Sequence, residues 1–336
     1  MKISVRQGAL SSASMILGTM TQNIRLIAVM ALLAGLLSAC GMQPDMAPHM
    51  RPLPKDAMML LGKKGMTAEA PIFIRIFKEE SELEVWKARD DGYFHHFKTY
   101  PICNWSGELG PKMKEGDKQA PEGFYTITKG QMNPNSSFHL AFNLGYPNNY
   151  DRAHKRSGSA LMVHGKCRSI GCYAMTDALV EEIYALARDQ FAAGHENFPV
   201  HAYPFRMTDE NMNRFKQDRW FAFWQTLKEG YDHFEAHRQV PPITVCEKRY
   251  HVNAKPAVHL ASTRVDPEGR CPRLEKLHAT PFTPKAKDMT TLADARVMAP
   301  GPKMRGVATT ELPDDRRSTS RGVFSGIMSL GFFGTK

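Results

Sequence analysis

A run of twelve apolar residues, 26–37, lies near the start of the chain and limits which part of it can fold as a domain. Arg25 precedes the run, and the small residues Ser38 and Ala39 lead to Cys40. A basic flank, a short apolar core and small residues at its end are typical of a secretory signal peptide, whereas a membrane-spanning helix needs about 20 apolar residues. We therefore expect export, with the following residues folding in an oxidising compartment.

The last residues of this segment, Leu37-Ser38-Ala39-Cys40, resemble the lipobox of bacterial lipoproteins. The resemblance implies that residues 1–39 are a lipoprotein signal peptide and that Cys40 carries the lipid; an ordinary signal peptide cut nearby is the alternative. Acyl chains anchor a protein firmly in a membrane, because each buried methylene contributes about 0.8 kcal/mol to membrane binding. Gly41, rather than Asp, follows the cysteine, which by resemblance to enterobacterial sorting favours the outer membrane. We expect a periplasmic protein that is anchored in that membrane by its lipid.

The net charge of +10 raises the question of a nucleic-acid partner, and its distribution argues against one. Residues 1–40 carry three basic residues and no acid, which gives +3. Residues 251–336 carry 14 Lys or Arg and 8 Asp or Glu, which gives +6, so only +1 remains for residues 41–250. A broad phosphate-binding face needs positive charge clustered on the folded part. We therefore expect no nucleic-acid partner.

Residues 71–250 carry short apolar segments separated by turn signals, which predicts one domain of the α+β class. The isoleucines at 72, 74 and 76 alternate with other residues, as in a strand, and Asp90-Asp91-Gly92 is a hairpin turn signal. A helix is predicted to begin at Thr176 or Asp177, and residues 208–235 are predicted to form one or two more helices. Strands are predicted at 72–77, 83–88, 93–100, 124–128, 138–143, 161–163 and 243–246.

Segments of a different composition flank this domain on both sides. Residues 40–70 contain four closely spaced prolines and are predicted to form an extended tether. Residues 251–336 are basic, contain eight prolines and lack long periodic segments, so we expect a largely disordered tail that is dispensable for chemistry. A chain ending near Tyr250 should then fold, unless Cys246 forms a disulfide with Cys271.

The cysteine count points to a reactive thiol. Once Cys40 is set aside, five cysteines remain, and an odd number leaves at least one thiol unpaired within the monomer. An imidazole close to such a thiol can activate it as a nucleophile by taking its proton. His164 follows a predicted strand, and the loop 165–171 can return Cys172 to it. His164 and Cys172 are therefore the candidate catalytic pair.

The segment from His164 to Cys172 resembles the catalytic motif of the L,D-transpeptidase (YkuD) family, in which His-Gly is followed by a loop and then by Ser/Thr-His-Gly-Cys. This chain has His164-Gly165 and Ser169-Ile170-Gly171-Cys172. The short loop and Ile170 depart from the family pattern, and both departures fit its YafK-like branch. Further segments that resemble the family or this branch are Ala120-Pro121-Glu122-Gly123-Phe124-Tyr125, Tyr100-Pro101-Ile102-Cys103, Leu109-Gly110-Pro111 and Gly171-Cys172-Tyr173-Ala174-Met175-Thr176-Asp177.

The resemblance implies a fold and a reaction. The fold would be a mostly β domain, sandwich-like or barrel-like, with added helices after the cysteine. Cys172 would attack the carbonyl at the L-centre of meso-diaminopimelate in a peptidoglycan stem peptide, with His164 as the base and with no cofactor or metal. Ser169 or a backbone carbonyl would orient the imidazole, and the amides of Gly171 and Cys172 would form the oxyanion hole.

The resemblance also leaves one substrate contact to be assigned. Ala174 stands where the wider family often has an arginine two residues after the cysteine. Another residue must then recognise the carboxylate of the stem peptide. Arg168, together with Gly165, is the predicted substrate-binding group.

Several alternatives stay open. An amine acceptor would give transpeptidation, and water would give hydrolysis at the same carbonyl, which in some members of the branch releases lipoprotein attached to peptidoglycan. A non-catalytic, wall-binding lipoprotein is a third alternative. Cys167 could instead bond Cys172 or Cys103, or Cys167, Cys172 and His164 could hold Zn²⁺ with a fourth ligand. His139, on a predicted strand near the site, is a candidate for a second role.

Overall fold

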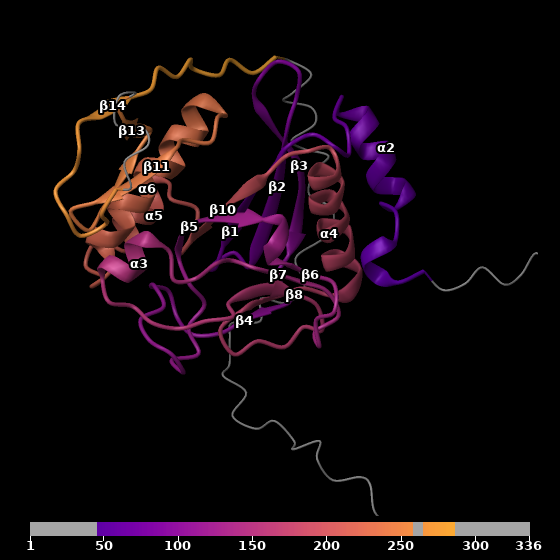
Figure 1. Cartoon of the computed structure of the whole chain (residues 1–336), viewed down its shortest axis with the longest axis horizontal. Coiled ribbons are helices and arrows are strands. Elements are labelled where there is room, and N and C mark those ends of the chain that lie inside the picture. The colour runs from indigo at the N-terminus through magenta and orange to yellow at the C-terminus, as the bar shows by residue number, and fades with distance from the viewer. Residues whose placement is uncertain (1–45, 258–264, 286–336) are drawn as a thin grey trace, which may run out of the picture.

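The structure, a computed structural model, describes residues 46–257 and 265–285 (Figure 1). The predicted signal peptide and Cys40 lie outside the described residues, as does the end of the predicted tail. Two five-stranded sheets and the helices around them make up most of the described part. Within that part, no helix is both long and apolar enough to cross a membrane.

The first sheet has the strand order β3-β2-β1-β10-β5. Strands β1 and β10 run parallel, and the other neighbours are antiparallel. The predicted turn Asp90-Asp91-Gly92 joins β2 to β3, so the four predicted strands in this sheet are confirmed, whereas β10 is not among the predicted strands. The strands are β1 (Ile72–Phe77), β2 (Glu82–Ala88), β3 (Phe94–Pro101), β5 (Gly123–Thr128) and β10 (Asn197–Tyr203).

Strand β1 is buried on both faces, which explains its sequence. Its three isoleucines belong to the main hydrophobic core, which both sheets share. Its other face packs against α6 (Phe221–His237), where the ring of Phe73 lies 4.7 Å from that of Phe234. Arg75 on the same face pairs with Glu84 at 2.7 Å and with Glu235 at 2.6 Å. A buried guanidinium is tolerated there because two carboxylates compensate its charge.

The second sheet has the strand order β4-β9-β8-β7-β6. Strands β8 and β9 run parallel, and the other neighbours are antiparallel. The prediction of an α+β domain dominated by β-sheet is confirmed, and among the described residues neither sheet closes into a barrel. The strands are β4 (Asn104–Trp105), β6 (Met132–Asn133), β7 (Ala141–Asn143), β8 (Met162–His164) and β9 (Tyr173–Ala174).

The helices predicted after Cys172 are confirmed. Helix α4 (Asp177–Ala192) begins after Thr176, whose hydroxyl accepts from the amide of Leu179 and caps the helix. This helix contacts β1, β7 and β8, so it braces both sheets. Helices α5 (Asp209–Arg214) and α6 follow β10. The remaining short helices are α3 (Asn149–Ala153) and the 3₁₀ turn η3 (Lys129–Gln131).

The segment before β1 is folded, contrary to the predicted extended tether. It contains the 3₁₀ turn η2 (Pro48–Met50) and the helix α2 (Lys55–Lys63). Leu53, Ala57 and Leu61 are buried in the main core. Two of the prolines on which the tether prediction was based, Pro48 and Pro54, stand at the starts of these helices, where proline is favoured because its missing N–H needs no partner.

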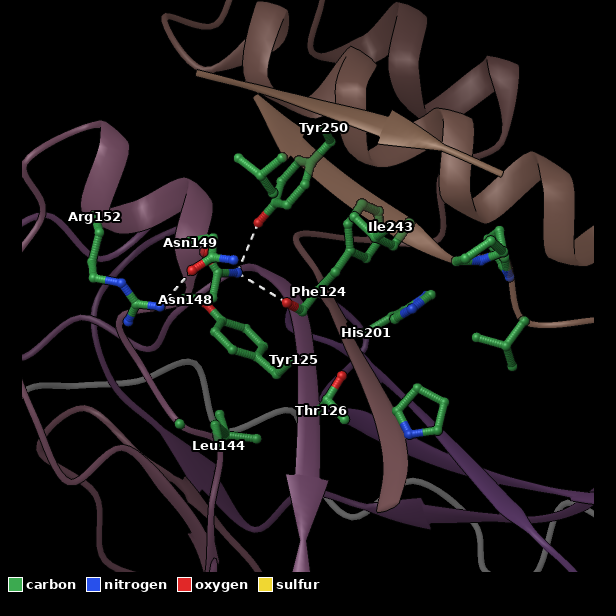
Figure 2. A pocket seen from close by; sticks show the side chains of 16 residues that line it. Phe124, Tyr125, Thr126, Leu144, Asn148, Asn149, Arg152, His201, Ile243 and Tyr250 are labelled. Carbon is green, nitrogen blue, oxygen red and sulfur yellow. Dashed lines mark hydrogen bonds between the residues drawn. The ribbon is translucent and has the colours of Figure 1, made fainter. Parts of the chain in front are cut away.

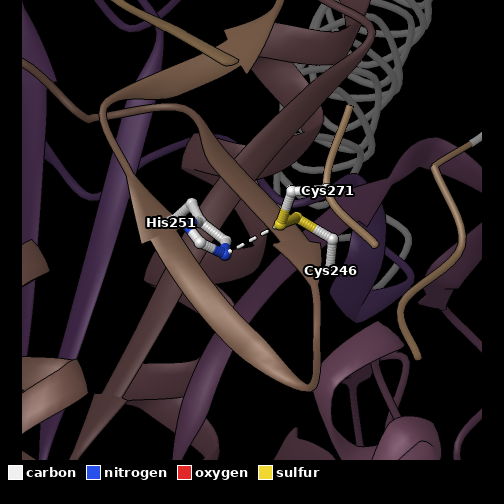
Figure 3. Close-up of side chains that lie close together, drawn as sticks. All are labelled: Cys246, His251 and Cys271. Carbon is white, nitrogen blue, oxygen red and sulfur yellow. Dashed lines mark hydrogen bonds between the residues drawn. A yellow bond between two sulfur atoms is a disulfide. The ribbon is translucent and has the colours of Figure 1, made fainter. Parts of the chain in front are cut away.

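The domain also continues past the predicted boundary at residue 250. Strand β11 (Ile243–Cys246) pairs with β12 (Arg249–Val252), and β13 (Ala254–Pro256) pairs with β14 (Leu274–Lys276). A disulfide joins Cys246 to Cys271 (Figure 3). The amide of Phe282 donates to the carbonyl of Ala236 on α6. The described part of the predicted disordered tail therefore belongs to the domain.

Candidate active site

Two parallel strands bring His164 and Cys172 onto one face of the second sheet. His164 is the last residue of β8, and Cys172 immediately precedes β9. Val163 is paired with Tyr173, and both are fully buried in the main core. Because side chains alternate along strands, His164 and Cys172 point to the opposite side. The strand register pairs His164 with Ala174, so the loop 165–171 returns the chain to the strand beside the histidine.

A disulfide between Cys103 and Cys167 holds the loop between the two strands. The amide of Cys103 donates to the carbonyl of Ala174, and the amide of Cys167 donates to that of Met175, so the bond lies against β9. Among the described cysteines only Cys172 is free. This pairing decides between the alternatives: Cys167 is not bonded to Cys172, and its sulfur is not available as a zinc ligand beside His164.

His164 has the tautomer that a general base requires. Its Nδ1 lies 2.7 Å from the carbonyl oxygen of Gly165, and because a carbonyl only accepts, Nδ1 carries the proton. The lone pair of the neutral ring is therefore on Nε2. Burial lowers the pKa of His164 below its ordinary value of 6.5, although the hydrogen bond to Gly165 works in the other direction. The ring also packs against Phe138, with 4.7 Å between the ring centroids.

Cys172 is a protonated thiol in this environment. Burial raises its pKa above the ordinary value, and the amide of Met162 and the charge of Lys112 offset only part of this effect. The Sγ atom accepts from the Met162 amide at 3.4 Å and lies 3.6 Å from the carbonyl oxygen of Ala160. A partly buried, neutral thiol is a weak nucleophile, so attack requires a base that takes its proton.

Ser169 closes the turn before the cysteine and does not orient the imidazole. Its hydroxyl oxygen accepts from the amides of Gly171 and Cys172, at 3.2 and 3.0 Å, and donates to the carbonyl of Cys172 at 2.7 Å. The carbonyl of Gly165, the other predicted alternative, orients His164 instead. The two amides predicted to form the oxyanion hole are thus both bonded to Ser169. Gly171 has φ 139°, which favours glycine at this position.

The two predicted substrate-binding residues have different surroundings. Gly165 is tightly packed, because a Cβ there would lie 2.5 Å from Asp177 Oδ1 and 3.0 Å from the Cβ of His139. Arg168 is exposed on the loop. His139, the candidate for a second role, bonds Glu181 through Nε2 at 2.6 Å. The structure therefore gives Gly165 a packing role and His139 an acidic partner on α4.

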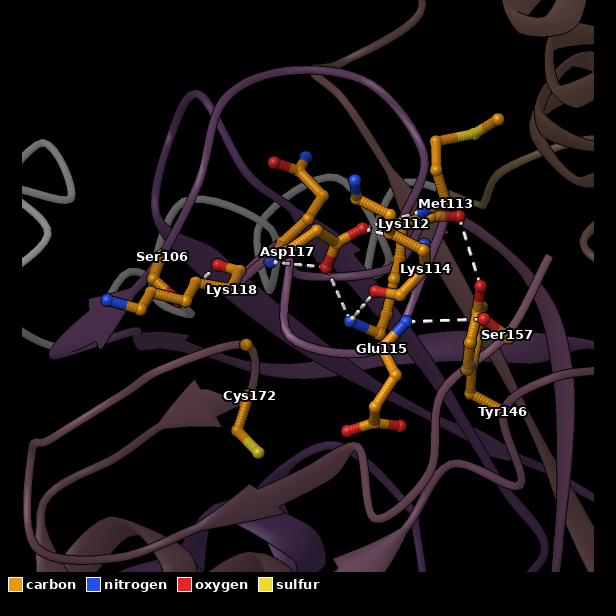
Figure 4. A network of polar contacts seen from close by, with 12 residues as sticks. Ser106, Lys112, Met113, Lys114, Glu115, Asp117, Lys118, Tyr146, Ser157 and Cys172 are labelled. Carbon is orange, nitrogen blue, oxygen red and sulfur yellow. Dashed lines mark hydrogen bonds and ion pairs between the residues drawn. The ribbon is translucent and has the colours of Figure 1, made fainter.

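A loop that the sequence analysis did not assign to the site lies beside Cys172 (Figure 4). Residues 112–119 are organised by Asp117, whose carboxylate accepts from Lys112 Nζ at 2.5 Å and from the amides of Met113, Lys114 and Gln119. Lys112 is buried. No local pattern marks these residues as functional, because their position follows only from contacts with distant segments.

The upstream segment that resembles the family supports the same loop. The Glu122 carboxylate accepts from Lys78 at 3.0 Å, from the Gly110 amide at 2.7 Å and from the indole of Trp224 at 2.8 Å. The side chains of Lys78 and Glu122 are fully buried. Through the Gly110 amide, this buried ion pair fixes the start of the loop to the core. The hydroxyl of Tyr173, the residue after Cys172, donates to the carbonyl of Pro121 at 2.6 Å. The bond between Tyr173 and Pro121 therefore links the upstream segment to the strand that follows the cysteine.

Two further features lie away from this pair. A cavity of about 370 Å³ lies between β5, α3 and β11, and its lining includes Phe124, Arg152 and Tyr250 but neither His164 nor Cys172 (Figure 2). His251 Nε2 lies 3.2 Å from the sulfur of Cys271 (Figure 3). The three side chains Cys246, His251 and Cys271 have the composition of a metal site. Because both sulfurs are joined in the disulfide, no thiolate is available to bind a metal there.

The amino-acid sequence of the chain is similar to those of known proteins. The family model of the YkuD L,D-transpeptidase catalytic domain matches residues 73–201. The chain is 44% identical over 207 residues to the Escherichia coli K12 protein named "Putative L,D-transpeptidase YafK", and the match covers 60% of this chain and 83% of that protein. The corresponding protein of E. coli O157:H7 has the same identity and coverage.

Two solved structures are similar at a lower level. The helical cell shape determining protein Pgp2 of Campylobacter jejuni has a TM-score of 0.33 and 17% identity, over 58% of this chain and 80% of that chain. Bd1075 of Bdellovibrio bacteriovorus has a TM-score of 0.27 and 20% identity, over 49% of this chain and 61% of that chain. The family follows from the sequence match to YafK, which spans most of that protein: this chain belongs to the L,D-transpeptidase (YkuD) family.

Proposed function

We propose that the chain catalyses cysteine-dependent acyl transfer on peptidoglycan stem peptides, at the L-centre carbonyl of meso-diaminopimelate. The observation that carries this proposal is the free thiol of Cys172 on the same sheet face as His164, whose Nε2 is unprotonated. Family membership supports a wall peptide as substrate. The intact pair argues against a non-catalytic, wall-binding role.

The geometry supports a mechanism in two half-reactions. The thiol proton of Cys172 passes to Nε2 of His164 as the sulfur attacks the carbonyl carbon, which forms the C–S bond. The C–N bond then breaks, and the departing amine takes the proton from the imidazolium. An acceptor attacks the thioester in the second half-reaction: an amine gives a new amide, and water gives a carboxylate. With water as acceptor, release of a wall-linked lipoprotein is the corresponding outcome.

Product analysis in heavy-oxygen water tests the function and identifies the acceptor. Purified sacculi are incubated with the full chain in labelled water, digested with a muramidase and analysed by mass spectrometry. Transfer to an amine gives exchanged or cross-linked muropeptides without label, and hydrolysis gives a shortened peptide that carries the label. A Cys172→Ala sample is the matched control. If wild type and control gave identical muropeptides, the chain would not act on this substrate.

The protonation states of the pair predict an unusual pH profile for a cysteine enzyme. His164 must be neutral to act as base, and burial lowers its pKa. Turnover should therefore fall on acidification only below about pH 6.5. Burial keeps Cys172 protonated, so the resting pair is uncharged, and no alkaline loss is expected between about pH 7 and 9. Measuring kcat/KM as a function of pH shows both the acidic and the alkaline side of the profile. An alkaline limb in that window would indicate a thiolate–imidazolium pair instead.

We further propose that Cys40 is lipidated. The lipid would anchor the chain in the outer membrane, with the protein in the periplasm. The lipobox Leu37-Ser38-Ala39-Cys40 supports this. Metabolic labelling with a palmitate analogue should tag the wild-type chain and miss Cys40→Ser, which should also become soluble in the periplasm. Cys172→Ala, which removes a different cysteine, should label like the wild type. Equal labelling of wild type and Cys40→Ser would refute the anchor.

A further inference from the structure

In the part of the chain that the structure describes, the two amides predicted to form the oxyanion hole already have a hydrogen-bond partner. Attack by Cys172 moves negative charge onto the substrate oxygen, and enzymes of this chemistry place donors or cations there in advance. The amides of Gly171 and Cys172 are both bonded to Ser169. His164 donates its Nδ1–H to the carbonyl of Gly165. A positive group near the thiol could supply this stabilisation.

Lys112 is a fixed cation on the loop beside the thiol (Figure 4). Its side chain is only 4% exposed, and its ammonium bonds Asp117 Oδ1 at 2.5 Å and the carbonyl of Lys114 at 3.0 Å. An ammonium has three N–H donors, so these two acceptors leave one. Burial raises the effect of a charge on its surroundings, because water screens it less.

Lys112 and Cys172 both lie against the same short segment, residues 158–160. Gly158 makes room for the lysine, since a Cβ there would lie 2.5 Å from Lys112 Cε. Two residues later, the carbonyl of Ala160 lies 3.6 Å from the sulfur of Cys172. The segment is tied to the loop through the amide of Ser157, which donates to the carbonyl of Met113 at 3.1 Å. The position of the lysine relative to the thiol is thus set by hydrogen bonds.

We propose that Lys112, held by Asp117, is a fixed cation that stabilises the negative charge formed at Cys172 and on the substrate during attack. The inference goes beyond the proposed function, because it concerns the charge at the thiol whatever the acceptor is. The direction of the electrostatic effect agrees with it: the charge of Lys112 lowers the pKa of Cys172, against the larger effect of burial. Asp117 has its own pKa lowered, because hydrogen bonds from Lys112 and three amides outweigh burial, so it stays a carboxylate that holds the lysine.

Alkylation of Cys172 by iodoacetamide tests the proposal without any substrate. Lys112→Met is expected to slow alkylation at neutral pH by roughly 3- to 10-fold and to move its pH profile toward higher pH, because the thiolate loses a nearby cation. Lys112→Arg keeps the charge and should recover most of the rate. Lys129→Met makes the same charge change at an exposed lysine on η3 and should alkylate like the wild type.

Turnover and folding complete the test. Lys112→Met should lower kcat by about 10-fold with little change in KM, since the charge acts on the reacting atoms rather than on substrate binding. Thermal melting of each variant reports whether the loop still folds. If Lys112→Met melted lower but alkylated like the wild type, the role would be structural only. If KM rose and alkylation were unchanged, the lysine would bind substrate instead, and the proposal would be wrong in either case. Because alkylation needs no wall peptide, a failed proposed function leaves this test intact.

Discussion

Replacing Cys172 with alanine is expected to abolish acyl-enzyme formation and to reduce turnover on purified sacculi to background. The physical reason is that Cys172 is the unpaired thiol among the described cysteines and lies on the same sheet face as His164. Intact-protein mass spectrometry after incubation with a soluble muropeptide measures this directly. The wild-type chain should gain the mass of one acyl group, and the variant should gain none.

A companion variant separates loss of chemistry from loss of fold. His164→Ala should lower the rate by about 10²–10⁴-fold, as expected when a general base is removed. Its Cys172 should still react with iodoacetamide, which shows that the turn around the cysteine is intact. Wild-type turnover by Cys172→Ala would contradict the assignment of the nucleophile, and full activity of His164→Ala would contradict that of the base.

Truncation after residue 250 is expected to destabilise the domain strongly, whereas truncation after residue 285 should leave it intact. The shorter chain loses the disulfide between Cys246 and Cys271, which closes a loop with a sequence separation of 25. Closing a loop of this size contributes roughly 3 kcal/mol. Since 1 kcal/mol shifts the melting temperature of a domain of this size by about 2–4 °C, the loss from the disulfide alone is about 6–12 °C.

Packing around the cut adds to this loss. The ring of Tyr250 is buried and stacks on Tyr150 with 4.2 Å between centroids, and its hydroxyl accepts from the Asn148 side chain at 2.9 Å. Removing the rest of β12 leaves this contact at a free end. Thermal melting of the two truncated chains measures the difference, and reduction of the longer one separates the disulfide from the packing. Equal melting temperatures would show that residues 251–285 do not stabilise the domain and that it ends near residue 250.

Local patterns predicted most of the elements that form the sheets. The alternation in β1, the turn signal before β3 and the cap of α4 act between near neighbours, so sequence alone shows them. Strand β10 was harder to predict because Pro199 interrupts it. Pro199 lies opposite Thr126 of β5, and on its other side the parallel pairing with β1 begins only at Val200, one residue later.

The ends of the domain could not be predicted in the same way. Prolines in residues 40–70 and 251–285 resemble those of linkers, and composition does not show whether a segment finds a partner. Helix α2 is stable because Ala57 and Leu61 reach the core, and the C-terminal strands are held by a disulfide and by contacts with α6. These contacts join residues that are far apart in the chain.

Sequence alone was sufficient to propose which residues are the nucleophile and the base. His164 and Cys172 are separated by a short loop between two strands, and the chemistry of a thiol and an imidazole follows from the residue types. Their surroundings depend on the fold. The pairing of Cys103 with Cys167, the bond from Ser169 to both amides and the position of Lys112 beside the thiol bring together segments that only tertiary packing places in contact. Burial by those segments also sets the direction in which the pKa values of His164 and Cys172 shift, because the cost of a charge depends on how much water the fold removes around it.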